Sequence, residues 1–288
     1  MPSTYAHYRM GQEVVRLVPD HMKQVIDNNR ELFEIGLHGP DILFYYKPLS
    51  ANEINETGYG MHDHAGREFF EHAAYVLKQK DYESSYLAYV YGFICHFTLD
   101  TTCHGYIGEK IAASGVSHAE IEVEFDRELM IKDGFNPISH KLTNHIVPAA
   151  RNSEVISPFF EGITSKQVQK ALQGMISTNN LLLVPSKCKR LFVHTLLHVA
   201  GNYKEMHGLM INATKNPHCN NSTEKLLHFY EVARGRAVKM IYEYGEFLSG
   251  EMQLDAIYNF TFAGEKANRE EQQNEYETDK TRKELGIV

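Results

Sequence analysis

Three potential metal ligands recur at four-residue intervals in the stretch His96-Phe-Thr-Leu-Asp100-Thr-Thr-Cys-His104. Four residues of an α-helix turn through about 400°, so each of these side chains is rotated by only about 40° from the one before it. All three would therefore lie on one face of a helix, over two turns. Imidazole and carboxylate groups are ligands that suit zinc and other first-row divalent metals. The stretch predicts a long helix with a metal-binding face, and it indicates a metal-dependent hydrolase.

A second pair of potential ligands, His118 and Glu122, follows with the same spacing. The sequence Ser117-His-Ala-Glu120 is a capping box, so His118 is expected in the first turn of the next helix. A lone His-x3-Asp pair is more often a surface hydrogen bond than a metal site, but two facing helices could bring five or six ligands together. Asp100 has two carboxylate oxygens and could bridge two metal ions about 3.5–4 Å apart, an arrangement that clamps a phosphate and activates water.

Helical periodicity runs through almost the whole chain, and alternating β-branched runs are scarce. Loops are expected at 36–41 and 50–60, and short helices with loops at 135–162. We predict the main helices at about 11–29, 61–80, 83–112, 118–134, 164–177, 187–213 and 222–249. No internal repeat or linker is visible, so residues 1–263 are expected to form one all-α domain. Residues 264–288 are densely charged and are predicted to be an exposed tail.

Composition narrows the class of protein. The net charge of −8 argues against a nucleic-acid partner, although bound metal ions would still allow an anionic substrate. The N-terminal residues lack the pattern of a signal peptide, no apolar run is long enough to span a membrane, and the four cysteines form no CxxC pair. We therefore expect a cytoplasmic protein with reduced, packed thiols. No basic amphipathic helix is evident, so stable membrane anchoring is not expected.

The ordered set of ligands resembles the zinc-dependent phospholipase C family, whose site is shared with certain fungal single-strand nucleases. That family carries an N-terminal His, a loop Asp, a further His, a helix with His-x3-Asp and a later His, and then a His-x3-acid pair. Here the pattern falls, in order, on His7, Asp41, His62 or His64, His96 with Asp100 and His104, and His118 with Glu122. Tyr91-Gly-Phe-Ile-Cys-His96 and Phe97-Thr-Leu-Asp100 match the central helix of the family, and the resemblance covers about residues 4–130.

The resemblance implies a single multi-helix domain with two or three zinc ions between helices. His62, His96 and Asp100 would hold one zinc. His104, His118 and Glu122 would hold a second, and His7 with Asp100 would hold a third. Asp41 would be the base for the attacking water, or would orient it.

Two histidines compete for one of these positions. His62 and His64 are two residues apart, so on a helix they face about 200° away from each other and cannot both point inward. The Gly-Arg-acid-Phe-Phe sequence that follows resembles intracellular members of the family and favours His62. The chain has no Trp, whereas the secreted members bind the third zinc with an N-terminal Trp.

The resemblance implies a phosphoesterase that hydrolyses a phospholipid-like phosphodiester with a zinc-activated water. The substrate would be a small-molecule or lipid phosphoester. Phe44 and Tyr45 could line a head-group pocket, because aromatic faces attract quaternary ammonium ions, or they could simply pack in the core. Two alternatives stay open. One is a zinc hydrolase of the single-strand nuclease or nucleotidase type, and the other is a non-catalytic zinc-binding protein that kept the fold.

Overall fold

The computed structural model describes residues 4–199 and 208–266, and of residues 197–199 it describes the backbone alone. Over these ranges the regular structure is helical, and the β pairings are limited to two isolated bridges, Ala65–Thr261 and Phe260–Lys266. The predicted all-α fold is therefore confirmed. In the same ranges, no helix is both long enough and apolar enough to cross a membrane.

The helices follow one another along the chain as α1 (Thr4–Val14), α2 (Asp20–Asn28), α3 (Arg30–Gly36), η1 (Gly39–Tyr45), α4 (Glu53–Asp63), α5 (Gly66–Gln79), α6 (Ser84–Ser114), α7 (His118–Lys132), α8 (Ala150–Ile156), η2 (Ser157–Phe159), α9 (Ser165–Leu182), α10 (Lys187–Val199), η3 (Pro217–Cys219), α12 (Asn220–Ser249) and η4 (Ala256–Asn259). The elements labelled η are 3₁₀ helices.

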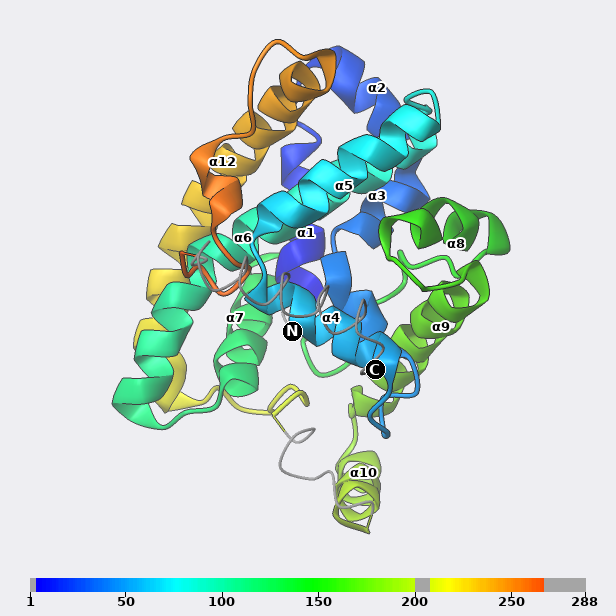
Figure 1. Cartoon of the computed structure of the whole chain (residues 1–288). Helices are drawn as coiled ribbons and strands as arrows, with labels where there is room; N and C mark the ends of the chain where they lie inside the picture. The colour runs from blue at the N-terminus through cyan, green and yellow to red at the C-terminus, as the bar shows by residue number, and fades with distance from the viewer. Residues whose placement is uncertain (1–3, 200–207, 267–288) are drawn as a thin grey trace, which may run out of the picture.

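Helix α6 is the centre of the fold, with α12, α3, α5 and α1 packed around it (Figure 1). Every residue from 88 to 100 is buried, so this part of α6 is surrounded by protein on all sides. At Gly92, a Cβ atom would lie 2.1 Å from the carbonyl oxygen of Phe33 on α3. The missing side chain therefore lets the backbone of α3 approach α6 closely, one turn before His96.

Some predicted boundaries were wrong. The helix expected at 11–29 is two helices, because Pro19 separates α1 from α2 and cannot continue a helix from the preceding turn. The loop expected at 50–60 is mostly helix α4, which begins with a capping box in which Asn52 and Asn55 cap each other. Residues 39–41, expected in a loop, begin the 3₁₀ helix η1.

The later helices follow the prediction in part. Helix α9 continues beyond 177 to Leu182. The helix predicted at 187–213 is α10, which ends at Val199; residues 200–207 lie outside the described residues, and 208–213 form turns and loop. Of the four cysteines, three are buried free thiols, as expected, whereas Cys188 is exposed.

The last described segment crosses back over the centre of the fold. After η4, the chain pairs with the start of α5 through the hydrogen bond from Gly66 N–H to the Phe260 carbonyl and the Ala65–Thr261 bridge. The hydroxyl of Thr101 on α6 donates to the Thr261 carbonyl at 3.3 Å. Phe262, in this crossing, is 1% exposed. Most of the predicted tail, residues 267–288, lies outside the described residues.

Candidate metal centre

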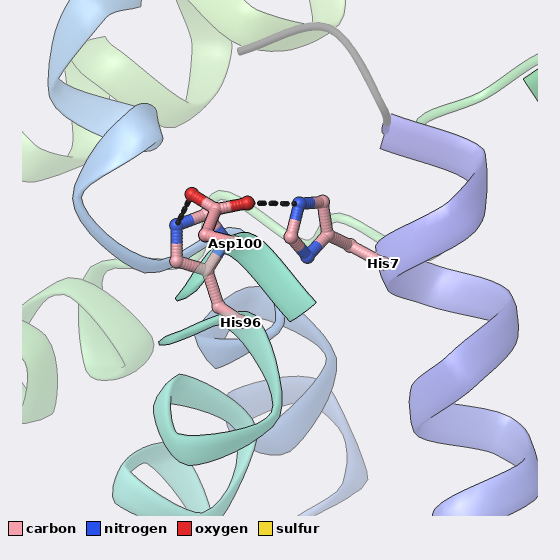
Figure 2. Close-up of side chains that lie close together, drawn as sticks. All are labelled: His7, His96 and Asp100. Atoms are coloured by element: carbon pink, nitrogen blue, oxygen red, sulfur yellow. Dashed lines mark ion pairs between the residues drawn. The ribbon is translucent and has the colours of Figure 1, made fainter. Parts of the chain in front are cut away.

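The Asp100 carboxylate is the point on which the predicted ligands converge. It is 3% exposed, and Figure 2 shows it between the imidazoles of His7 and His96. Its Oδ1 atom lies 3.1 Å from His7 Nε2 and 3.7 Å from His104 Nε2. Its Oδ2 atom lies 3.3 Å from His96 Nε2 and 3.8 Å from His62 Nε2. Imidazoles from α1, α4 and α6 thus meet at one buried carboxylate.

The nitrogen and oxygen atoms of the predicted site fall into three groups that could each hold a metal ion. Within each group the potential ligand atoms all lie within 4.8 Å of one another. The groups are His7 with His96 and Asp100, Asp41 with His62 and His96, and His104 with His118 and Glu122. The structure therefore brings together all seven residues predicted to bind metal, and it places Asp41 among them. This position makes Asp41 a potential ligand as well as a potential base.

Local structure explains how these side chains reach the centre. Ser117 begins α7 by accepting the backbone N–H of Glu120, and this sets His118 and Glu122 one turn apart on the new helix. Both His118 Nε2 and His104 Nε2 lie 3.1 Å from Glu122 Oε1. Asp41 lies in η1, which packs closely on α6. A Cβ atom at Gly39, whose φ is +48°, would lie 2.2 Å from the His96 ring.

Backbone carbonyls orient two of the imidazoles. His62 Nδ1 lies 2.9 Å from the Gly58 carbonyl, and His104 Nδ1 lies 2.9 Å from the Phe262 carbonyl. A carbonyl only accepts a hydrogen bond, so each Nδ1 carries a proton, and each Nε2 is the ring nitrogen that faces the carboxylates. Histidines that bind metal usually donate their other ring nitrogen in this way.

Several potential ligand atoms of the centre form no well-aligned hydrogen bond in the part of the chain that the structure describes, although most of them contact one another at 3.1–3.8 Å. They are buried, and they are Asp41 Oδ1, His62 Nε2, Asp100 Oδ2 and both ring nitrogens of His96. Buried polar atoms in native proteins are usually hydrogen-bonded, so a buried cluster of nitrogen and oxygen atoms without well-aligned hydrogen bonds needs an explanation. Metal coordination supplies one, and imidazole with carboxylate is a donor set that zinc accepts. The residues present therefore fit zinc.

The electrostatics favour a bound cation. Burial acts to raise the pKa of Asp100, but His104, His96 and His7 outweigh it and hold that pKa well below its usual range. Burial likewise acts to lower the pKa of His104, but Asp100 and Glu122 raise it to about 9. The carboxylates are thus ionised near neutral pH, and they draw positive charge into a buried site.

A comparison with known families agrees with this geometry. The family model of zinc-dependent phospholipase C matches residues 6–171, which is more than half of the chain and includes every predicted ligand. The chain belongs to the zinc-dependent phospholipase C family. No curated protein and no solved structure matches it. Membership of this family supports a metal-dependent phosphoesterase and a zinc cofactor, for which the three ligand groups are the candidate sites.

The pattern of the zinc-dependent phospholipase C family allowed either His62 or His64 as the third histidine of the site. The structure places these two side chains in different surroundings. The side chain of His64 is 52% exposed and pairs with Glu68, one turn later on the surface. His62 Nε2 lies 3.1 Å from Asp41 Oδ1, inside the cluster. The geometry therefore places His62 at the centre.

The aromatic residues beside the centre are mostly buried. Phe44 and Tyr45 are 5% and 7% exposed, so their contribution to a head-group pocket is limited. Phe44 stacks on Tyr59 with ring centroids 4.2 Å apart. The centroid of the Phe44 ring lies 5.3 Å from that of the His62 ring. Tyr59, which sequence reasoning missed, is 53% exposed. Tyr59 lies three residues before His62, almost one helical turn, and this spacing could have indicated it.

Sequence reasoning also missed residues that support the ligands. Asp126 on α7 is 1% exposed and accepts the backbone N–H groups of Tyr5 and Ala6, immediately before His7. Asp126 follows Glu122 by four residues, the same interval that separates His118 from Glu122. This spacing could have indicated that Asp126 lies on the same face of α7. No sequence spacing could have indicated Phe262, because it lies far along the chain from the other residues of the centre.

Proposed function

We propose that the protein is a zinc-dependent phosphoesterase that hydrolyses a phosphodiester bond in a phospholipid-like substrate. The observation that carries this proposal is the convergence of three groups of mostly buried nitrogen and oxygen ligand atoms around Asp100. Zinc enzymes that cleave phosphodiesters use neighbouring ions for this chemistry, and Asp100 presents its two oxygens to different imidazoles. Membership of the zinc-dependent phospholipase C family supports the same reaction.

The ligand roles follow the three groups. His104, His118 and Glu122 would hold one zinc, and His96 and Asp100 would hold a second, with His62 or His7 completing the set. When bound, zinc would offset the charge of the phosphoryl oxygens and lower the pKa of water from 15.7 to about 7. The side chain of His118 is 44% exposed and that of His62 is 17% exposed, so a substrate could reach the centre on the side of these two imidazoles.

Asp41 is the residue suited to handling the attacking water. Burial acts to raise the pKa of Asp41, but nearby positive charge, including that of His62 and His96, lowers it to about 2. An ionised carboxylate at the edge of the centre can accept a hydrogen bond from a water molecule and align it, and its low pKa favours this orienting role over that of a general base. The aligned water would lose its proton to solvent, attack phosphorus and break the bond to the alkoxide on the opposite side, and the alkoxide would take up a proton from solvent. Tyr59, exposed and stacked on Phe44, offers a ring face to a cationic head group near His62.

The test replaces Asp100 by Asn, which keeps the shape of the side chain and removes its charge. The protein is assayed for zinc per chain and for hydrolysis of phosphatidylcholine, a chromogenic phosphodiester and single-stranded DNA. Asp100→Asn should lose bound zinc and reduce phosphodiesterase activity by about a hundredfold or more. Asp63→Asn is the control, because it makes the same change at an exposed position one residue after His62. This variant should keep its zinc content and its phosphodiesterase activity.

Three outcomes would count against the proposal. Full zinc content and full activity in Asp100→Asn would show that the ligand assignment is wrong. Turnover of single-stranded DNA without turnover of either phosphodiester would favour the nuclease alternative. Bound zinc without turnover of any substrate would favour a non-catalytic zinc-binding protein.

A further inference from the structure

A hollow of about 350 Å³ lies beside the metal centre, between α4, the start of α5 and the segment 159–161. Its walls are mainly apolar and are formed by Met61, Phe69, Phe159, Phe160 and Phe262. Pockets for small molecules in proteins commonly have volumes of about 300–1,000 Å³ and mostly apolar linings, so this hollow has the size and composition of a ligand site.

The side chain of Phe262 lies between the hollow and the metal centre. The ring of Phe262 lines the hollow, and its centroid lies 5.2 Å from that of His62 and 5.9 Å from that of His96. Met61, also in the lining, directly precedes His62 on α4. A molecule held at His62 could therefore extend across Met61 and Phe262 into the hollow without leaving the protein surface.

The position of Phe262 is well fixed. Its carbonyl accepts the hydrogen bond from His104 Nδ1, and the preceding residue, Thr261, is bridged to Ala65. Phe262 lies beyond residue 171, where the match to the family model ends. This wall of the hollow is therefore supplied by a part of the chain that the family pattern does not cover.

Four titratable side chains line the hollow: Glu68, Glu161, His64 and His72, and Glu68 pairs with His64. Glu68 and Glu161 are its acidic lining residues, and both are exposed. The described lining residues include no Lys or Arg to hold a phosphate or the carboxylate of a free fatty acid, and an uncharged hydrocarbon needs no such partner. A hydrocarbon chain in the hollow gains from this contact because its own apolar surface leaves water, while the lining phenylalanines are already almost fully buried.

We propose that this hollow binds an acyl chain of the phospholipid whose phosphoryl group is held at the metal centre. The inference rests on the proposed function and adds a specificity site to it. Each methylene group that enters an apolar site contributes about a fourfold gain in affinity. The enzyme should therefore prefer longer acyl chains until the hollow is filled.

The experiment fills the hollow from two lining positions. Thr57→Phe on α4 and Ala65→Leu before α5 each add an apolar side chain at a lining position. Glu56→Phe is the matched control, because it places the same ring on the neighbouring residue of α4, which is exposed and does not line the hollow. For each protein, kcat/KM is measured with dibutanoyl, dihexanoyl and dioctanoyl phosphatidylcholine, all presented as monomers.

The decisive quantity is the ratio of kcat/KM for the dioctanoyl substrate to that for the dibutanoyl substrate. In the wild-type chain and in Glu56→Phe, this ratio should be well above one. In Thr57→Phe and Ala65→Leu it should fall about tenfold or more, as two or more methylene groups lose their site. An unchanged ratio in both filled variants, or a ratio near one in the wild type, would overturn the proposal.

A binding measurement separates this proposal from the catalytic one. Octanol is titrated into the wild-type chain and into Thr57→Phe, and its binding is followed by NMR. If no phosphodiester is hydrolysed but octanol binds the wild type and not the filled variant, the proposed function fails and the apolar site stands. If tetramethylammonium binds at this position and octanol does not, the hollow is a site for a cationic head group and the acyl-chain proposal is wrong.

Discussion

Asp126 fixes the backbone at Ala6, the residue before His7. Its Oδ1 atom accepts the N–H of Ala6 at 2.8 Å, and its Oδ2 atom accepts the N–H of Tyr5 at 2.9 Å. The first N–H groups of a helix have no partner within the helix, and a carboxylate satisfies them while its charge suits the helix dipole. Asp126 lies on α7 with His118 and Glu122. One helix therefore carries two candidate ligands and also holds the turn that presents a third.

Replacing Asp126 by Asn should weaken both stability and zinc binding. The change removes the charge and turns one acceptor into a donor that faces a backbone N–H group, so the free energy of unfolding should fall by about 3 kcal/mol. Urea unfolding measures this loss, and competition with a chelator measures zinc affinity. Asp133→Asn is the control, because Asp133 also joins α7 to α1 but bonds the side chains of Tyr5 and Arg9. Equal zinc affinity in the two variants would show that Asp126 does not position His7.

His62 and His64 provide a paired test of the ligand assignment. His62→Ala should lower zinc affinity and activity, because it removes a nitrogen that lies 3.1 Å from Asp41 and 3.8 Å from Asp100. His64→Ala should leave zinc affinity unchanged and alter stability by no more than about 0.5 kcal/mol, since its side chain is half exposed. Competition with a chelator measures the zinc affinity of both variants and so shows which histidine binds zinc. A larger effect from His64 would reverse the assignment.

The sequence could predict the parts of this centre that depend on local spacing. The four-residue intervals at His96, Asp100 and His104 fix their common face within one helix, whatever surrounds it. The start of α7 at Ser117 could be predicted for the same reason, because a cap acts over one turn. Helix α4 was missed because its cap uses Asn55 where the usual capping box has Glu or Gln.

Contacts between distant segments could not be predicted in this way. His38 and His145 are far apart in the chain, yet their Nε2 atoms lie 2.7 Å apart. Phe262 reaches the centre only because the segment after α12 crosses back over α6. No periodicity links such residues, so only the packed fold reveals them.

Gly92→Ala should destabilise the fold, although alanine normally favours a helix. A Cβ atom at Gly92 would lie 2.1 Å from the Phe33 carbonyl oxygen, and backbone on both helices would have to move. Overpacking of this kind destabilises by about 1–3 kcal/mol, which exceeds the gain of about 1 kcal/mol in helix propensity. Gly108→Ala on the same helix meets no atom within 4 Å and should stabilise the protein by up to about 1 kcal/mol. Urea unfolding compares the two, and a stabilised Gly92→Ala would contradict the close approach of α3 and α6.

Acidification should destabilise the protein partly through the pair formed by His38 and His145. Burial lowers the pKa of His38 well below 6.5 and that of His145 to about 3, and Tyr8 stacks on His145 at 4.1 Å. In the unfolded chain these imidazoles titrate near 6.5, so between about pH 3 and 6.5 the unfolded state binds more protons. Their contribution to stability is therefore fully present above pH 6.5 and is lost as the pH falls toward 3.

His145→Gln removes one of these titrating groups and should flatten the dependence. In that window each proton taken up on unfolding changes the free energy of unfolding by about 1.4 kcal/mol per pH unit. The slope of the variant should therefore be smaller than that of the wild type by up to this amount. Urea unfolding at a series of pH values between about 5 and 7.5 measures both slopes. His21→Gln, at an exposed position on α2, should keep the wild-type slope. An unchanged slope in His145→Gln would mean that His145 takes up its proton as readily in the folded protein as in the unfolded chain.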